Sequence, residues 1–142
     1  MIESNIVTKY ITLCSEGEND IIDITRNVDE ILRESQLKNG IVILFVVGST
    51  AAITTIEYEP GLRKDFPRML ERIASKDIEY EHENTWHDDN GHAHVRASLI
   101  GPSLTIPFVD GRVTLGTWQQ IVLLELDTRS RNRKIVAQLI GR

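Results

Sequence analysis

The feature that most constrains the fold is the run from Ile41 to Val47, in which β-branched, aliphatic and aromatic residues follow one another without a polar residue. Glycines stand on both sides of it, at Gly40 and Gly48. The run is too short for a typical core helix, and glycines commonly bound regular elements. It therefore predicts a buried strand in the core of a sheet.

Two amphipathic helices are expected to accompany this strand. The first is predicted to begin at Asp20 and to stop at Asn39-Gly40, because apolar residues recur there at spacings of three and four: Ile21, Ile24, Val28, Ile31 and Leu32. The second is predicted over 62–73 by Leu62, Phe66, Met69, Leu70 and Ile73. Asp65 is its expected capping residue, with Pro67 in the first turn.

The remaining segments are expected to be strands. They cover 5–15, 51–58, 92–98, 103–109, 113–126 with a bend at Gly116, and 134–140, and the pair Asp110-Gly111 is a strong hairpin signal. No linker or repeat interrupts residues 1–142. We expect one α+β domain with a mostly antiparallel, curled sheet or sandwich of about seven strands and two helices.

Composition excludes several classes of function. The net charge of −5 is unlike that of proteins that bind nucleic acid, and no stretch is apolar enough to cross a membrane. The N-terminus lacks a basic region followed by an apolar run, so a cytoplasmic location is expected. The single cysteine, Cys14, excludes an intrachain disulfide and is expected to be a free, buried thiol. The one basic cluster, Arg129 to Lys134, could hold a small anion.

All four histidines lie between His82 and Ser98. His92, His94 and Arg96 share one parity there, so in a strand they would project from one face while Ala93 and its alternate neighbours pack on the core. Two imidazoles at this spacing can converge on one metal ion, and the other interpretation is a solvated strand face.

A metal needs a third ligand, for which His82 is preferred over His87, Asp88, Asp89 and Glu57. Three histidines would leave one position open for water or substrate, as in catalytic zinc sites. Zinc is the expected metal, with magnesium as the alternative.

Other residues are candidates for contact with a substrate. Arg96 lies one pleat beyond His94 and suits a phosphate, although a surface ion pair is the alternative. Ser49 and Thr50 offer hydroxyl groups to an anion, or form a simple turn. Trp118 is more often a core residue than a platform for a ligand, and Gln119 within an apolar strand would need a partner.

Several segments together resemble the YjbQ-like family. They are GSTAAITTIE at 48–57, His82, NGHAHVRASLIGPSLTIP at 90–107, DGRVTLGTWQQI at 110–121 and LDTRSRNRKIVAQLIG at 126–141, and they cover most of the chain. His82, His92 and His94 match histidine positions of the family, and Arg96, Ser103, Trp118 and Gln119 lie in its motifs. Many members have a histidine where this chain has Gly48.

The resemblance implies a compact α+β homotrimer with a histidine-lined metal site near a subunit boundary. It also implies an activity of the secondary thiamine-phosphate synthase type, in which a hydroxymethylpyrimidine pyrophosphate couples to a thiazole phosphate and releases pyrophosphate. On this hypothesis His82, His92 and His94 bind the metal, and Arg96, Glu57 and Gln119 take part in catalysis. Ser49, Thr50, Ser103 and Trp118 would line the binding site.

Two other functions remain open from the sequence. One is a metal-dependent hydrolase of a small phosphorylated or acyl substrate, with Glu57 or Asp88 as the base. The other is a trimeric protein that binds a metabolite without turnover. A small phosphorylated metabolite is the expected partner of the enzyme, and neither nucleic acid nor a membrane is expected.

Overall fold

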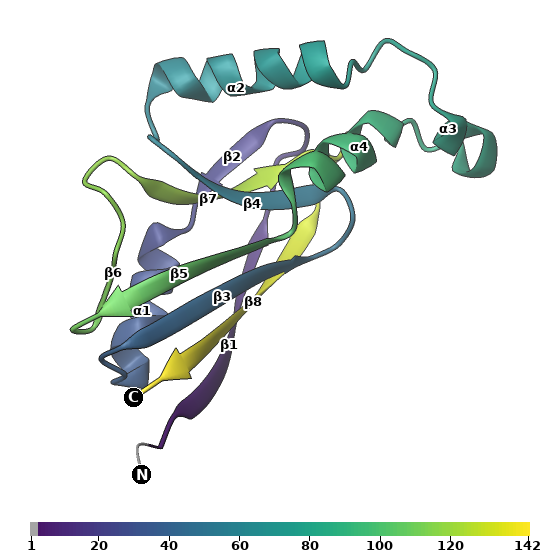
Figure 1. Ribbon diagram of the computed structural model, residues 1–142. Coiled ribbons are helices and arrows are strands. Elements are labelled where there is room, and N and C mark those ends of the chain that lie inside the picture. The colour runs from purple at the N-terminus through teal and green to yellow at the C-terminus, as the bar shows by residue number, and fades with distance from the viewer. Residues whose placement is uncertain (1–2) are drawn as a thin grey trace.

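The computed structural model describes residues 3–142, which form two antiparallel sheets and four helices (Figure 1). One sheet has the strand order β1, β8, β3, β5, β6 and the other the order β2, β7, β4. The strands are β1 (Asn5–Cys14), β2 (Asp20–Asp23), β3 (Gly40–Val47), β4 (Ala51–Ile56), β5 (Ser103–Val109), β6 (Arg112–Val113), β7 (Gln120–Glu125) and β8 (Asn132–Gly141). The helices are α1 (Thr25–Ser35), α2 (Pro60–Ile73), α3 (Glu81–Trp86) and α4 (Gly91–Ile100). The predicted α+β class with antiparallel pairing is confirmed, with more elements than expected.

The predicted strand over Ile41 to Val47 is confirmed as β3, at the centre of the larger sheet. It pairs with β8 on one edge and with β5 on the other. Its even-numbered side chains, among them Val42 and Leu44, are fully buried against α1 and the smaller sheet. Its odd-numbered side chains face outward, and Phe45 and Val47 are exposed. The strand is thus buried on one face, with an apolar outer face.

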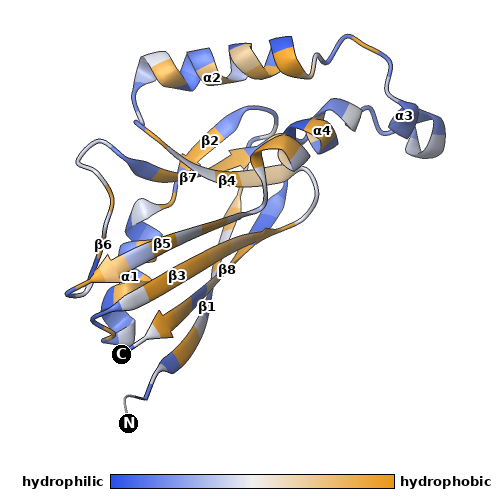
Figure 2. Ribbon diagram, in the orientation of Figure 1, coloured by the Kyte–Doolittle hydropathy of each residue, from blue (hydrophilic) through white to orange (hydrophobic). Residues whose placement is uncertain are grey.

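The smaller sheet has a second apolar layer on its other side, covered by α2 and α4 (Figures 1 and 2). Leu70 of α2 and Ala93 and Ala97 of α4 pack there against Val122 and Leu124 of β7. Figure 2 shows that α3, by contrast, is largely hydrophilic. This arrangement leaves α3 and the start of α4 as a polar extension at one end of the molecule.

The first predicted helix is shorter than expected. Residues Asp20–Asp23 form β2, which pairs with β7 through Ile21 and Leu124, and α1 begins only at Thr25. The spacing of Ile21 and Ile24 predicts a helix here. A strand forms instead, because pairing with the buried strand β7 outweighs the weak local preference for a helix. The helix ends at Ser35, with Gln36 in the left-handed conformation.

The second predicted helix exists, but its start was wrong. Helix α2 begins at Pro60, and the Glu59 carboxylate caps it by accepting hydrogen bonds from the amides of Gly61 and Leu62. Pro60 fits the first turn because its missing N–H would have no intrahelical partner. Pro67 lies inside the helix, not in its first turn, and Asp65 is not the cap.

The largest correction concerns the histidine segment, where the predicted strand over 92–98 is the helix α4. Ala93, Ala97 and Ile100 recur at spacings of four and three, and they form the stripe that packs on the smaller sheet. Gly101, with a φ of 102°, and Pro102 follow the last turn, as is common at helix ends. The same residues satisfy a period of two, which is why the sequence also fits a strand.

Three smaller expectations were also wrong. The predicted strand 113–126 is two strands, β6 and β7, with a loop at 114–119 between them. Trp118 in this loop is 73% exposed, so it is not a core residue. Cys14 is free as expected but exposed, and its thiol contacts the Asn132 side chain at 2.7 Å. The hairpin predicted at Asp110-Gly111 does join β5 to β6.

Candidate functional site

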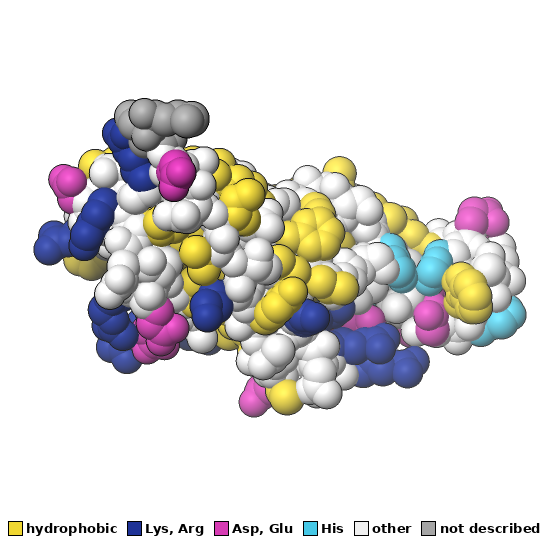
Figure 3. All heavy atoms as spheres, turned by 90° about the horizontal axis from the view of Figure 1, so that it is seen from below, with side chains coloured by type: hydrophobic (Ala, Val, Ile, Leu, Met, Phe, Trp, Pro, Cys, Tyr) yellow, Lys and Arg dark blue, Asp and Glu magenta, His cyan; other side chains and the backbone are white. Residues whose placement is uncertain are grey.

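The site centres on two histidines, His82 from α3 and His94 from α4. Their rings lie side by side, with centroids 4.3 Å apart and planes inclined by 50°. Burial, and then the neighbouring His82, lower the pKa of His94 below its ordinary value. The neutral imidazole is therefore favoured, and neutral imidazole is the form that binds metals. Figure 3 shows histidine side chains gathered at this end of the molecule.

Two carboxylates complete the cluster. Ligand atoms of His82, Glu83 and Asp88 all lie within 4.8 Å of one another. Asp88 Oδ1 lies 3.3 Å from His82 Nε2, yet it is buried and has no hydrogen-bond partner among the described residues. A buried carboxylate oxygen without a donor is costly, unless a cation or a further donor satisfies it. One imidazole and two carboxylates at this spacing suit a divalent metal such as zinc, and the ring of His94 lies next to them.

A buried polar network holds His82 in place. His82 Nε2 lies 3.1 Å from Asn90 Oδ1, and the Asn90 amide donates to Asp127 Oδ2 at 3.5 Å. Thr50 and Arg131 also donate to Asp127. Burial raises the pKa of Asp127, but the hydrogen bonds from Thr50, the Thr128 amide and Arg131 outweigh it and hold the pKa below its ordinary value. The network therefore ends in an ionised carboxylate.

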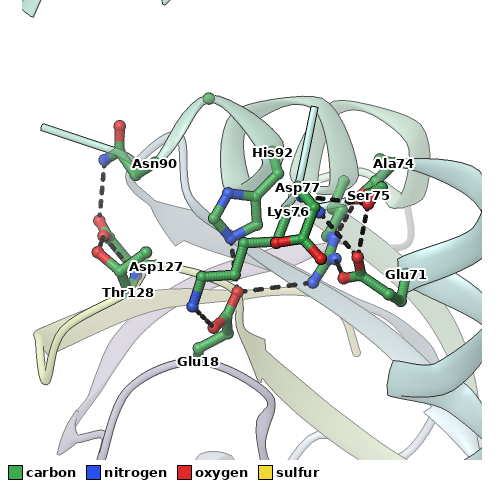
Figure 4. Close-up of polar contacts among 12 residues, drawn as sticks. Glu18, Glu71, Ala74, Ser75, Lys76, Asp77, Asn90, His92, Asp127 and Thr128 are labelled. Atoms are coloured by element: carbon green, nitrogen blue, oxygen red, sulfur yellow. Dashed lines mark hydrogen bonds and ion pairs between the residues drawn. The ribbon is translucent and has the colours of Figure 1, made fainter. Parts of the chain in front are cut away.

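His92 does not join the other two histidines, contrary to the predicted shared face. It is 1% exposed, and its Nε2 lies 2.5 Å from Glu18 Oε1 (Figure 4). Lys76 binds the other oxygen of the same carboxylate at 2.9 Å. Two residues along a helix correspond to a rotation of about 200° around its axis, so the side chains of His92 and His94 point to nearly opposite sides of α4. His92 fastens α4 to the loop between β1 and β2.

Arg96 is also a buried structural partner, not the expected surface for a phosphate. Its side chain is 1% exposed, donates to Glu71 at 2.7 Å and to the Ala74 carbonyl at 3.0 Å, and lies 3.8 Å from Glu18. It shares the face of α4 with His92, one turn away. Both ends of its planar group are occupied, so α2 and α4 are joined through it.

The other predicted site residues lie apart from the histidine cluster. Glu57 is exposed just beyond β4, and Ser103 is exposed at the start of β5. Gln119 donates to Thr55 Oγ1 and accepts from the Gly116 amide, which supplies the partner that its position required. Figure 1 places the loop between β6 and β7, which carries Trp118 and Gln119, at the end of the molecule opposite α3.

Ser49 and Thr50 differ from each other. Thr50 is buried, accepts from Arg133 Nη2 at 2.7 Å and donates to Asp127 at 2.9 Å, so it belongs to the network behind His82. Ser49 is exposed in the turn between β3 and β4. Arg133 donates from Nε and Nη2 to both oxygens of the buried Glu125.

The sequence did not single out Glu18, Asn90, Asp127 or Arg133 as parts of one site. Each is a polar residue in a segment read as turn or strand, and their partners are distant along the chain, as with Glu18 and His92. Asn90 gave the best available signal, because it lies two residues before His92. Charged residues beside the apolar strand β7, such as Asp127, gave a weaker one.

A cavity of about 380 Å³ adjoins the cluster on the side of α3. Lys76, Tyr80, Glu83 and His92 are among the residues that line it. It has room for a small molecule and borders Glu83 of the cluster. No helix within residues 3–142 is long and apolar enough to cross a membrane.

The comparisons with known proteins agree on one family. The model of the family described as UPF0047 protein YjbQ-like matches residues 9–142. A UPF0047 protein of Methanothermobacter thermautotrophicus is 38% identical over 137 residues, which cover 96% of this chain and 94% of that protein. The UPF0047 protein YugU of Bacillus subtilis is 31% identical over 135 residues, with coverage of 94% and 98%.

Solved structures share the fold. A crystal structure from Sulfolobus solfataricus P2, described as a YbjQ-like protein of unknown function, has a TM-score of 0.92 at 33% identity and covers 99% of this chain and 100% of its own. A hypothetical protein from Aeropyrum pernix K1 has a TM-score of 0.88 at 32% identity, with coverage of 96% and 99%. Because the match in sequence and in fold extends over nearly the whole chain, the chain belongs to the YjbQ-like UPF0047 family.

Proposed function

We propose that the protein is a metal-dependent enzyme that acts on a small phosphorylated metabolite. The observation that carries the proposal is the contact of His82 with His94 beside Asp88 Oδ1, a buried carboxylate oxygen without a hydrogen-bond donor among the described residues. We assign His82, His94 and Asp88 as metal ligands, with Glu83 as a fourth candidate, and we leave His92 out of the set. Zinc is the proposed metal, because imidazole and carboxylate ligands suit it.

The reaction that we propose first is of the secondary thiamine-phosphate synthase type. Pyrophosphate would leave the hydroxymethylpyrimidine substrate as the ring nitrogen of a thiazole phosphate attacks the same carbon. A bound divalent metal would supply positive charge to the phosphoryl oxygens of such a substrate. Asn90 and Asp127 would keep His82 in one orientation, and the neighbouring cavity would hold the rings close together.

Hydrolysis is the second candidate, and the position of Asp88 favours it. Of the two bases considered for this reaction, Glu57 lies apart, just beyond β4, whereas Asp88 lies within the cluster. In this reaction Asp88 would act as the base in place of a metal ligand, and its carboxylate would accept a proton from the attacking water. Hydrolysis would need no second substrate, and this distinguishes it from the synthase reaction.

The working form is proposed to be a homotrimer. Large apolar side chains are exposed on the outer face of the five-stranded sheet: Ile6, Tyr10, Phe45, Val47 and Val109. Apolar side chains also spread across the face seen in Figure 3. Copies of this chain are the proposed cover for this face, because an extended apolar surface of this kind marks an interface.

The test begins with the metal content of the purified protein and anomalous scattering to locate the ion. We expect it beside His82 and His94; an ion elsewhere, or no ion after loading with zinc, manganese or magnesium, would refute the metal site. The loaded protein is then given both substrates. Thiamine phosphate formed only with both supports the synthase, and phosphate release without the thiazole supports hydrolysis. Tight binding by calorimetry without any product contradicts both and supports a metabolite-binding protein.

A further inference from the structure

Arg133 has one edge of its guanidinium group that no protein group occupies. Nε and Nη2 donate to the two oxygens of Glu125 and to Thr50, whereas Nη1 has no acceptor among the described residues. Asp88 Oδ1 is the sole side-chain polar atom in residues 3–142 that is both buried and without a partner. Nη1 must therefore reach the surface, although the Arg133 side chain is 94% buried, with 6% of it exposed.

Gly48 opens this edge to solvent. The last pair of the β3–β8 ladder is Val47 with Lys134, so Gly48 follows directly beside Arg133. A Cβ atom built on Gly48 would lie 2.7 Å from Arg133 Nη1. Any side chain at position 48 would thus cover or displace Nη1. Because Gly48 is exposed and has no side chain, no atom of a side chain at position 48 covers Nη1, and its N–H groups reach solvent there.

The groups around Nη1 suit an oxyanion. Ser49, next in the chain, is exposed, and its hydroxyl has no partner among the described residues. Glu125 holds the Arg133 plane rigidly by a bidentate pair, so the free edge is preoriented and little entropy is lost on binding. Arg96, the arginine expected from the sequence to bind an anion, already faces a carboxylate with its remaining nitrogen, because its Nη1 lies 3.8 Å from Glu18.

A chain of hydrogen bonds connects Arg133 to the histidine cluster. Arg133 donates to Thr50, Thr50 donates to Asp127, and Asp127 accepts from Asn90, which contacts His82. We propose that Arg133 Nη1, with Ser49 and the space left by Gly48, binds the phosphate group of a small substrate. The proposal deepens the proposed function by locating the anionic end of the substrate, and it rests on that function only for its catalytic meaning.

The experiment follows the binding of inorganic phosphate by NMR to ¹⁵N-labelled protein freed of metal with a chelator, at constant ionic strength in chloride. We expect saturable shifts at the Gly48 and Ser49 amides and at the Arg133 guanidinium. Gly48→Ala should weaken phosphate binding about tenfold, the equivalent of one charge-assisted hydrogen bond. Acetate should shift the same signals less, and an equal or stronger response to acetate would refute the assignment to phosphate.

Gly101→Ala is the matched control. Gly101 also has a positive φ, 102° against 136° at Gly48, but a Cβ there meets no atom within 4 Å. Both substitutions therefore strain the backbone, and only Gly48→Ala covers the arginine. Gly101→Ala should bind phosphate like the original protein; equal losses in the two variants, or shifts away from Gly48, would overturn the proposal. Ser49→Ala is a second, milder variant and should weaken binding without any change in folding.

The result of the phosphate-binding experiment is independent of whether a metal binds at His82 and His94. Phosphate binding at Gly48 in a protein that binds no metal at His82 and His94 would retain the anion site and refute the proposed function. Metal binding at the histidines without phosphate shifts at Gly48 would retain the metal site and refute the anion site.

Discussion

His92 and His94 lie on different sides of α4, although only Ala93 separates them. His92 is buried against Glu18 at 2.5 Å, whereas His94 lies beside the ring of His82. In a strand the two imidazoles would share one face; in a helix they diverge by about 200°. The metal site proposed for this protein therefore combines histidines from two helices, and His92 has a structural role.

Zinc affinity should distinguish the proposed ligand His94 from the structural His92. His94→Ala should reduce zinc affinity by more than the factor of about 100 that an outer-sphere partner contributes, because it removes a ligand. His92→Gln should leave the affinity nearly unchanged, since its side chain points away from the cluster. The measurement is competition with a chromophoric chelator. His87→Ala, at the exposed end of α3, is the control. Equal losses in the His92 and His94 variants would contradict the assignment.

Asn90 should affect the zinc affinity of the same site through its contact with His82. The Asn90→Ala variant loses the amide that bridges His82 and Asp127, so His82 is less well oriented. We expect zinc affinity to fall by about 10- to 100-fold. Circular dichroism should show the fold retained. An affinity equal to that of the original protein would show that Asn90 does not position His82.

Arg96 should be important for stability. Arg96→Met leaves the Ala74 carbonyl without its donor and removes the partner of Glu71, at a cost of about 3 kcal/mol of unfolding free energy. Arg68→Met is the control, because its pair with Asp65 spans 3.7 Å between side chains more than 60% exposed and is worth less than about 1 kcal/mol. Urea unfolding measures both, and similar values for the two variants would refute the structural role.

Stability should fall in acid through Glu18. Burial raises the pKa of Glu18, but hydrogen bonds and charges from Lys76 and His92 outweigh it and lower the pKa below its ordinary value of 4.5. A lowered folded-state pKa stabilises the protein above the unfolded-state pKa, and this contribution disappears as the pH falls through the folded-state value. Glu18→Gln should lose about 1.5 kcal/mol at pH 7 and little at pH 3. Glu16→Gln, exposed nearby, should behave like the original protein at both pH values in urea unfolding.

The outer sheet face should control assembly. Phe45→Glu places a charge within the apolar face of the five-stranded sheet, and we expect it to convert a trimer into monomers in sedimentation experiments. Ile78→Glu is a control of similar exposure, 57% against 45%, in the loop after α2. A trimer that survives Phe45→Glu would exclude this face as the interface. A monomeric original protein would refute the trimer itself.

The sequence by itself determined the elements whose local signals admit one interpretation. The apolar run at Ile41 to Val47 became β3, and Asp110-Gly111 became the β5–β6 hairpin. The antiparallel α+β class followed from these strands and their short connections. The position of the candidate site was also partly predictable, because a concentration of histidines is visible without a structure, and His82 and His94 do lie together.

Only the tertiary structure decided which period the histidine segment follows. His92, His94 and Arg96 fit a period of two, and Ala93 and Ala97 fit a helix equally well. The choice depends on the surface that receives the segment, and here the smaller sheet accepts a narrow stripe of alanines. The partners of the polar residues were also beyond local patterns. Glu18 and His92 meet only when α4 packs on the smaller sheet, and Gly48 and Arg133 meet only when β3 pairs with β8.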